Sequence, residues 1–230
     1  MITVFLLIDK PKGISSHDVI YRLRKITGEK KIGHAGTLDP NATGLLLVGV
    51  GRESTKKLWT KFGKLDKTYS AEITLGEERE TDDVKGEIRD PEFVTRINLI
   101  PRKPLIEEAL KTFVGEQLQI PPAFSAIKIK GKKAYELARK GPSLCPSLSP
   151  RKVTIYSIKL LEYKFPTLVI ETKVSSGTYV RALARDLGRK LKCGAYLNNL
   201  RRVKIGKYKV ENSVCLDKLT SKNISKYYFD

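Results

Sequence analysis

The sequence predicts an α+β fold with a mixed, mainly antiparallel sheet, and three observations support this prediction. Stretches with the two-residue alternation of strands recur along the 230 residues, and stretches with helical spacing lie between some of them. The two kinds do not follow a regular strand–helix–strand order, which is typical of sheets whose strands run mainly antiparallel. The length suffices for one large domain, or for one domain with a small appendage.

The first elements follow from local patterns. Residues 2–8 are apolar and run into Asp9-Lys10-Pro11-Lys12 without a basic leader, so we expect a first strand and not a signal peptide. Ser15 or Ser16 is expected to cap a helix whose apolar residues recur at helical spacing over 19–26, with Gly28 just past its end. The continuous apolar run over 44–50 indicates either a strand covered on both faces or the start of a buried helix.

Later segments show clearer periodicity. Residues 67–75 alternate apolar and polar side chains, which predicts a half-buried strand with Tyr69 on its covered face. Residues 104–114 begin with a proline that suits helix entry and carry apolar residues at helical spacing up to Gly115. Residues 153–163 and 167–174 are expected to be strands.

The C-terminal third closes with one helix and one strand. Apolar residues at helical spacing predict a helix over 178–191 that stops near Gly194. Its other side carries Arg181, Arg185 and Arg189 in an i, i+4, i+8 row, and such rows are most often solvated faces. Residues 203–210 alternate apolar and basic side chains and are expected to form a last strand.

Residues 119–151 differ from the rest of the chain. Five prolines bracket a basic stretch with interleaved aromatic residues, which includes Lys128, Lys130, Lys132, Tyr135, Arg139 and Lys140. This mixture fits a mobile insertion that becomes ordered on a nucleic acid, and it fits a plain surface loop about equally well.

The charge balance points to a polyanionic partner. The chain has 44 lysine and arginine residues against 25 acidic ones, a net charge of +19. Lysine and arginine bind phosphates with release of counterions, so RNA or DNA is the leading explanation. The alternative is a generally basic proteome or an ordinary solvated surface.

Cysteine and histidine usage argues against metal and disulfide frameworks. The chain has three scattered cysteines and two histidines, so neither a zinc site nor a disulfide framework is expected. No stretch approaches the length of a membrane span, and we expect a cytoplasmic protein.

One carboxylate stands out as a candidate reactive group. Asp39 lies in a loop that contains Gly33, Gly36 and Gly44, directly ahead of an apolar run, and Pro40 biases its backbone towards an extended conformation. A glycine-rich loop of this kind suits close approach to a ligand. Without further information, an ordinary turn with Asp39 as a turn residue is the more common explanation.

The other acidic residues gather in one stretch after the strand at 67–75. They are Glu77, Glu78, Glu80, Asp82 and Asp83, and we expect them to be solvated, because loop carboxylates commonly are. A metal-dependent nuclease built on Glu80, Asp82 and Asp83 is a rival hypothesis. No phosphate-binding Walker loop and no nucleophile elbow is present in the sequence. The remaining inventory suits covalent or general-base chemistry on a nucleotide.

The sequence also resembles a known family. Residues 33–40, Gly-His-Ala-Gly-Thr-Leu-Asp-Pro, followed by Ala42-Thr43-Gly44, resemble the active-site motif of the TruB family, the tRNA pseudouridine(55) synthases. Further matches lie in the same order along the chain, at residues 9–13, 15–18, 67–69, 75–76, 81–82, 86–87, 121–126, 130–139, 177–181 and 200–202. The guide-RNA-directed synthases share the Asp39 and Arg181 motifs but lack the spacing after Tyr69, which favours the stand-alone tRNA enzyme.

The resemblance implies roles for three catalytic residues. Asp39 would break the C1′–N1 glycosidic bond of the target uridine before C5 of the base is joined to the same sugar carbon. Whether Asp39 attacks that carbon or removes a sugar proton is left open. Tyr69 would stack on the extracted base and assist at C5, and Arg181 would pair with Asp39.

The resemblance also implies which residues bind the RNA. His34 would enter the T-loop where the uridine leaves its stack, Leu200 would pack against the flipped base, and Lys10 would grip the RNA. The remaining substrate-binding candidates are Tyr179, Lys132, Tyr135 and Arg139.

The family pattern completes the expectations for the whole chain. It implies a sheet flanked by helices with the active site in a central cleft, no metal or nucleotide cofactor, and the T-arm of tRNA as partner. We expect residues 1–230 to form a single catalytic domain that acts as a monomer without an obligate protein partner. After residue 210 about twenty residues remain, too few for the C-terminal RNA-binding PUA domain that bacterial members usually carry. A non-catalytic RNA-binding protein is the rival from another class.

Overall fold

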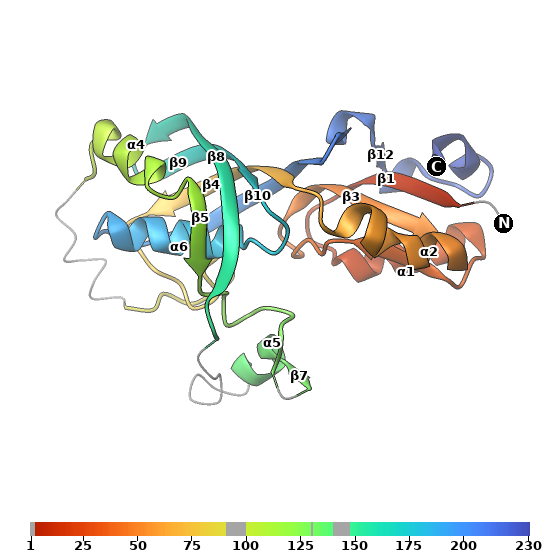
Figure 1. Cartoon of the computed structure of the whole chain (residues 1–230), viewed down its shortest axis with the longest axis horizontal. Helices are drawn as coiled ribbons and strands as arrows, with labels where there is room; N and C mark the ends of the chain where they lie inside the picture. The colour runs from red at the N-terminus through yellow and green to blue at the C-terminus, as the bar shows by residue number, and fades with distance from the viewer. Residues whose placement is uncertain (1–2, 91–99, 130, 140–147) are drawn as a thin grey trace. The chain divides into compact units, whose positions relative to one another are not determined.

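The computed structural model describes residues 3–90, 100–129, 131–139 and 148–230. The chain divides into two compact units, which are described separately (Figure 1). Unit 1 comprises residues 1–70 and 200–230, and unit 2 comprises residues 71–199. Strands β4 (Lys67–Leu75) and β10 (Ala195–Ile205) contribute residues to both units.

Unit 1 is built on a mixed sheet in the order β12-β1-β3-β10. Strands β1 and β3 pair antiparallel, β2 pairs antiparallel with β3, and β11 pairs antiparallel with β10. The β3–β10 and β1–β12 pairs are parallel. Besides β10, the strands of this unit are β1 (Val4–Lys10), β2 (Ile32–Ala35), β3 (Thr43–Val50), β11 (Tyr208–Lys209) and β12 (Val214–Cys215).

Both faces of β1 and β3 are covered, which explains why residues 44–50 are apolar without alternation. Leu46 and Val48 pack in one cluster with Leu23 of helix α1 (Ser16–Thr27). Leu45 and Leu47 pack in a second cluster with residues of α2 (Arg52–Leu58) and of the π-helical turn η1 (Trp59–Gly63). The strand alternative for this segment is therefore confirmed.

Helix α1 begins and ends as its sequence predicts. The Ser15 side chain accepts a hydrogen bond from the backbone N–H of Asp18, whose carboxylate accepts from the backbone N–H of Ser15. Gly28 ends the helix in the left-handed conformation, at φ 72°. Three short 3₁₀ turns follow β11, namely η3 (Val210–Asn212), η4 (Leu216–Lys218) and η5 (Ile224–Tyr227).

Unit 2 holds the strand order β10-β4-β9-β8-β5. Strand β8 (Arg151–Lys164) pairs antiparallel with β9 (Thr167–Val174) and with β5 (Gly115–Gln119). The observed bounds of β4 and β9 match the expected ranges 67–75 and 167–174. Tyr69 is 7% exposed, as expected for the covered face of β4.

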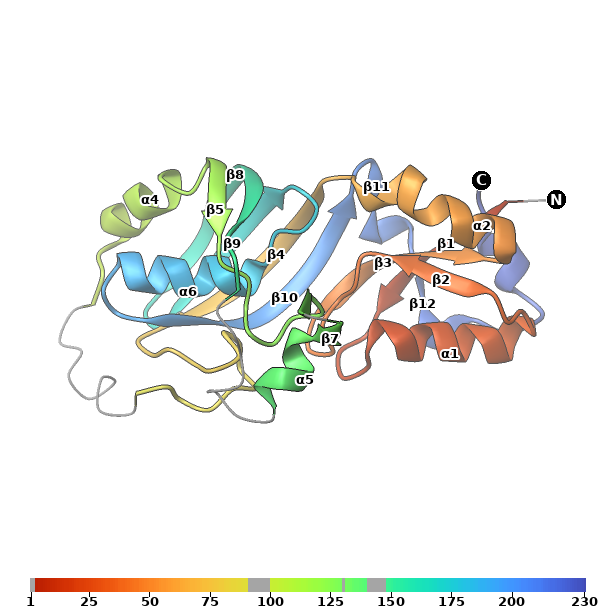
Figure 2. The same ribbon diagram turned by 60° about the horizontal axis from the view of Figure 1, so that its bottom comes forward.

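Two helices pack on this sheet, and a small insertion follows β5. Helix α4 (Lys103–Lys111) contacts β8 and helix α6 (Val180–Lys190), as Figure 2 shows from a second direction. In the insertion, β6 (Lys128–Ile129) pairs with β7 (Lys132–Lys133), and the short helix α5 (Ala134–Ala138) follows directly. Lys130 and residues 140–147 of the basic stretch lie outside the described residues.

The expected single strand over 203–210 is wrong. Residues 203–205 belong to β10, the chain turns at Gly206 and Lys207, and β11 returns antiparallel. The alternation of apolar and basic residues continues through this turn, because both strands of the hairpin place apolar side chains in the same cluster. None of the helices in the described ranges is long and apolar enough to cross a membrane.

Candidate active site

Hydrogen bonds to the backbone hold the Asp39 loop, between β2 and β3, at several points. The Ser16 hydroxyl of α1 accepts a hydrogen bond from the Leu38 N–H at 2.9 Å and donates to the Leu38 carbonyl at 3.1 Å. Beyond Asp39, the Pro40 carbonyl accepts from the Gly13 N–H at 2.8 Å. The Ala42 N–H donates to the Asp39 carbonyl at 3.0 Å, which closes a tight turn. The backbone on both sides of Asp39 is therefore fixed.

Arg202 of β10 donates hydrogen bonds to the backbone on both sides of the Asp39 loop, from within unit 1. Its Nε donates to the Leu45 carbonyl at 2.7 Å and its Nη2 to the Gly36 carbonyl at 3.0 Å, one on each side of Asp39. The side chain is only 1% exposed. A buried guanidinium that satisfies two carbonyls fixes both ends of the loop at once.

Lys10 lies in the same row of the sheet as Arg202. In the register of the three strands, Lys10 of β1 is opposite Gly44 of β3, and Gly44 is opposite Arg202 of β10. Gly44 has φ +101°, and a Cβ there would lie 2.3 Å from the Arg202 carbonyl oxygen. Only glycine fits this crossing, which explains one of the three glycines of the loop.

Lys10 is fully buried, and its ammonium group donates hydrogen bonds to backbone carbonyls of unit 1. Its Nζ donates to the carbonyls of Ile14 at 2.7 Å, Pro11 at 2.9 Å and Pro40 at 3.4 Å. Burial lowers the pKa of Lys10 to about 8, Asp39 opposes this shift, and Arg202 adds to it. An RNA contact through this ammonium stays a prediction and would require these hydrogen bonds to break.

A second buried lysine, Lys67 of β4, lies near the same arginine. Its Nζ donates to the carbonyls of Leu65 at 2.6 Å and Gly63 at 3.3 Å. Burial, reinforced by Arg202, lowers its pKa to about 8. Unit 1 therefore concentrates buried positive charge beside the loop that carries Asp39, which favours an anionic ligand there.

His34 lies on β2, partly buried, and its Nδ1 has no hydrogen-bond partner within the described residues. Burial, with smaller contributions from Arg202 and His17, lowers the pKa of His34 to about 4. The ring is therefore neutral at pH 7 and can contact a base without a charge. Leu200 of β10 is partly buried, and its carbonyl lies 3.5 Å from the Thr43 hydroxyl.

Two of the three arginines in the row of α6 are buried, contrary to expectation, while Arg189 is exposed. Arg181 is 5% exposed and Arg185 7% exposed. Arg181 donates to the carbonyls of Thr81 and Phe124, each at 3.0 Å. Its Nε also lies 3.8 Å from Asp83 Oδ2.

The acidic stretch is not uniformly solvated either. Asp82 is 3% exposed and accepts a hydrogen bond from Arg185 Nη1 at 2.8 Å, while Arg185 Nη2 donates to the Ile120 carbonyl at 2.9 Å. Glu78 accepts from Arg189 Nε at 2.9 Å. The prediction that the whole acidic stretch is solvated is wrong, because neither the acidic stretch nor the arginine row shows in its own sequence that the two segments pack together. The arginines hold residues 81–83 and 120–124 on α6.

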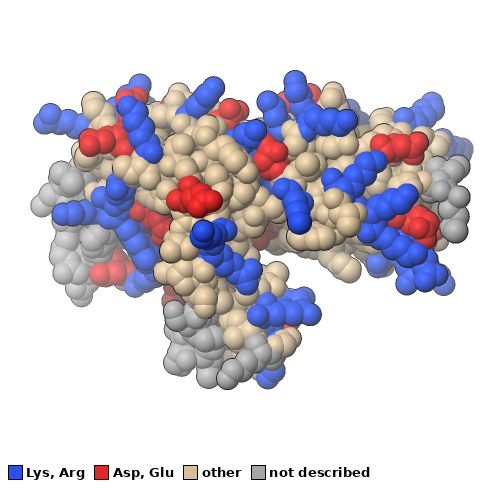
Figure 3. Space-filling view, viewed as in Figure 1, with Lys and Arg blue, Asp and Glu red and all other residues tan. Residues whose placement is uncertain are grey.

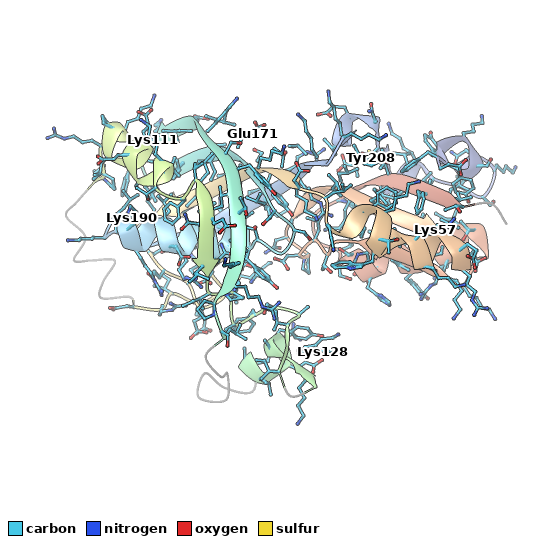
Figure 4. The ribbon with its side chains drawn as sticks, in the orientation of Figure 1. Lys57, Lys111, Lys128, Glu171, Lys190 and Tyr208 are labelled. Atoms are coloured by element: carbon cyan, nitrogen blue, oxygen red, sulfur yellow. The ribbon has the colours of Figure 1, made fainter. Side chains whose placement is uncertain are left out.

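Tyr179 precedes α6 and is held by a buried amide. Gln119 Oε1 accepts from the Tyr179 N–H at 2.8 Å, and Gln119 Nε2 donates to the Tyr179 carbonyl at 3.1 Å. The expected RNA-binding residues of the insertion lie together on α5 and β7. Lys132 and Arg139 are exposed, and the Arg139 guanidinium lies 5.4 Å from the centre of the Tyr135 ring. Lys128 of the same insertion is labelled in Figure 4.

Within the described ranges, no group of three or more histidine, cysteine or acidic side chains could hold a metal ion. In unit 1, Lys10, His34, Tyr69 and Leu200 lie on β1, β2, β4 and β10, and Asp39 lies in the loop between β2 and β3. In unit 2, Arg181 lies on α6 and Tyr179 directly precedes this helix. Sequence reasoning missed Arg202 as a site residue. Its only signal was the Leu-Arg-Arg match at 200–202, which does not distinguish the buried Arg202 from its half-buried neighbour.

Comparison with known families identifies the family of the chain. The family model for the N-terminal domain of TruB family pseudouridylate synthases matches residues 24–180. The model for the C-terminal domain of tRNA pseudouridylate synthase B matches residues 181–227. The chain belongs to the TruB family of pseudouridylate synthases. The family expected from the Asp39 motif is confirmed, and with it the enzyme class, an isomerase.

Relatives and solved structures agree with this assignment. The tRNA pseudouridine synthase B of Endomicrobium trichonymphae is 43% identical over 209 residues, which cover 91% of this chain and 87% of that protein. That of Protochlamydia amoebophila is 45% identical over 212 residues, covering 92% and 77%.

Among solved structures, a chain of a Cbf5–Nop10–Gar1 complex matches 94% of this chain with 28% identity and a TM-score of 0.71. A chain of an H/ACA RNP bound to a substrate RNA containing 2′-deoxyuridine matches with 26% identity and a TM-score of 0.67, again over 94% of this chain. The chain spans about half of each, 53% and 52%. The expected fold class is confirmed by these matches.

Proposed function

We propose that this chain converts uridine to pseudouridine in the T-loop of tRNA, at position 55. The supports are its family, the names of its relatives, tRNA pseudouridine synthase B, and its net charge of +19. We further propose that it acts in the cytoplasm, as a monomer, without a metal or nucleotide cofactor.

The observation that carries the proposal is the fixed loop around Asp39. Ser16, Arg202 and the Gly13 N–H hold the backbone on both sides of this carboxylate. Holding a reacting group in place removes much of the entropic cost of reaching the transition state. A turn residue without a catalytic task would not need several separate anchors, two of them buried side chains.

The reaction that we assign to Asp39 is an isomerisation. The C1′–N1 bond of uridine breaks, the base turns, and a C1′–C5 bond forms. The proton on C5 leaves, and N1 gains a proton, so no atom is gained or lost overall. Asp39 serves either as the nucleophile at C1′ or as the base that removes a sugar proton, and both routes return the carboxylate at the end.

Other residues are proposed to bind and position the base. The target nucleotide must leave its stack for the carboxylate to reach the sugar. We assign to Tyr69 a stacking role and assistance at C5, to Leu200 an apolar contact with the base, and to Arg181 a role in the same chemical step. The neutral His34 would fill the place that the base vacates.

Isotope release tests this function directly. Unmodified tRNA labelled with tritium at C5 of uridine should lose one tritium for each pseudouridine formed, and sequencing of the product should place it at position 55. Asp39→Asn should abolish release while tRNA binding is retained. Asp217→Asn, which removes an exposed carboxylate of the same unit, is the matched control and should keep full activity.

The same assay separates the two rivals. A non-catalytic RNA-binding protein would bind the tRNA without tritium release by the wild type. A metal-dependent nuclease would cleave the RNA only with magnesium, whereas isomerisation should proceed in EDTA and leave the RNA intact. Loss of activity in EDTA would refute the absence of a metal requirement.

A further inference from the structure

The tryptophan of this chain is exposed on a basic segment outside the Asp39 loop. Trp59 is the sole tryptophan in the sequence and begins η1, directly after α2. It is 63% exposed, the second highest value among the large apolar side chains that are exposed in the described ranges. An exposed aromatic face of this kind is available for a base to stack on.

The indole is supported from one side by the backbone. A Cβ at Gly63 would lie 2.5 Å from Trp59 Cε3 and 2.6 Å from Cδ2, so the ring rests directly against this glycine. Gly63 itself is buried. Within the described ranges, no aromatic ring or cationic group lies over the indole. The ring therefore rests against the backbone of Gly63 with a large part of its surface open to solvent.

The surroundings of Trp59 are strongly basic. Between residues 52 and 64 the basic side chains are Arg52, Lys56, Lys57, Lys61 and Lys64, all exposed. Glu53, the acidic residue of this segment, pairs with Lys56 at 2.9 Å. Figure 3 shows lysine and arginine side chains gathered over this part of unit 1, and Lys57 is labelled on α2 in Figure 4.

We propose that Trp59 is a stacking platform for an unpaired nucleotide of the bound tRNA, with the flanking lysines on its phosphates. An aromatic ring within a positively charged surface is the combination that binds single-stranded nucleic acid. An apolar protein partner would instead require burial of several lysines without acidic partners. The proposal rests on the proposed function for the identity of the RNA, and not on the Asp39 chemistry.

Trp59 provides its own probe, because the chain has no other tryptophan. Binding of an unmodified tRNA transcript should quench Trp59 fluorescence. It should also reduce the further quenching of this fluorescence by added acrylamide. A short single-stranded uridine oligonucleotide should quench it as well. A fully paired RNA duplex of equal charge should quench it much less, because its bases are already stacked on one another.

Variants separate stacking from charge attraction. Trp59→Ala should weaken tRNA binding by about 5- to 150-fold, the range for loss of one base–aromatic stack. Trp59→Phe should restore most of the affinity. Gly63→Ala should displace the indole and weaken binding, with less quenching. Tyr227→Ala removes another exposed aromatic side chain of unit 1 and should leave binding unchanged.

Each outcome decides the proposal. Unchanged fluorescence on tRNA binding, or equal affinity of wild type and Trp59→Ala, would overturn it while pseudouridine formation by the wild type continued. Fluorescence that changes with protein concentration alone, in step with dimer formation, would assign the surface to a second copy and overturn it too. A wild-type protein that neither binds nor modifies tRNA would refute the proposed function, and with it this inference.

Discussion

Two aspartate–arginine pairs of nearly equal length predict very different costs for the same substitution. Asp82 lies 2.8 Å from Arg185 in unit 2, and Asp217 lies 2.9 Å from Arg22 in unit 1. The side chains of the first pair are 4% and 9% exposed, whereas those of the second are 77% and 47% exposed. Changing each aspartate to asparagine therefore compares the same chemistry in a buried and an exposed setting.

The expected magnitudes follow from this difference in burial. Removing one partner of a buried pair leaves a buried charge uncompensated and costs about 3–5 kcal/mol. Arg185 also donates to Asp186 at 2.9 Å, which offsets part of the loss, so we expect about 3 kcal/mol for Asp82→Asn. An exposed pair contributes about 0–1 kcal/mol, which sets the expectation for Asp217→Asn.

Burial raises the pKa of Asp82, and Arg185, Arg89 and Arg181 oppose this effect. Asp82→Asn removes the carboxylate that faces these three arginines. High salt should shrink the effect of Asp217→Asn and leave that of Asp82→Asn nearly unchanged, because screening acts on exposed charges.

Urea unfolding followed by circular dichroism and by Trp59 fluorescence measures both variants. Trp59 reports on unit 1, which contains Asp217, and circular dichroism reports on both units. Coincident transitions by the two probes would justify a single free energy of unfolding. If Asp82→Asn costs no more than Asp217→Asn, then the buried pair does not hold residues 81–83 on α6, and our account of the arginine row fails.

Four further predictions concern the site. Arg202→Met leaves the Gly36 and Leu45 carbonyls without their donor and should cost about 2–6 kcal/mol in urea unfolding, together with a slower single-turnover rate. Gly44→Ala should destabilise far more than Gly13→Ala, because both glycines have positive φ but only Gly44 has a backbone oxygen in the way. The pKa of His34 is lowered to about 4, so the unfolded chain binds a proton that the folded chain does not. Stability should therefore fall by up to about 3 kcal/mol as pH drops from 6.5 to 4, and His34→Gln should flatten this slope. Arg181→Met should slow single-turnover pseudouridine formation at saturating enzyme more than it weakens tRNA binding, and an equal effect on both would refute a role in the chemical step.

Local sequence signals located most of the secondary structure. The serine cap and glycine end of α1, the alternation of β4 and the apolar spacing of α6 depend on side chains within a few residues of one another. Such signals survive in any tertiary context that agrees with them. The hairpin of β10 and β11 was missed because alternation alone does not show where a strand reverses. Gly206, at φ 53°, was the available signal for the turn.

The sequence by itself determined the α+β class, the TruB family and the position of Asp39, since these are written in periodicity and in one contiguous motif. Only the tertiary structure decided which charged side chains are buried. Asp82 and Arg185 are 103 residues apart, and Arg202 bonds to carbonyls 157 and 166 residues away. Whether a charge is solvated or buried depends on what packs over it, and that information lies in distant parts of the chain.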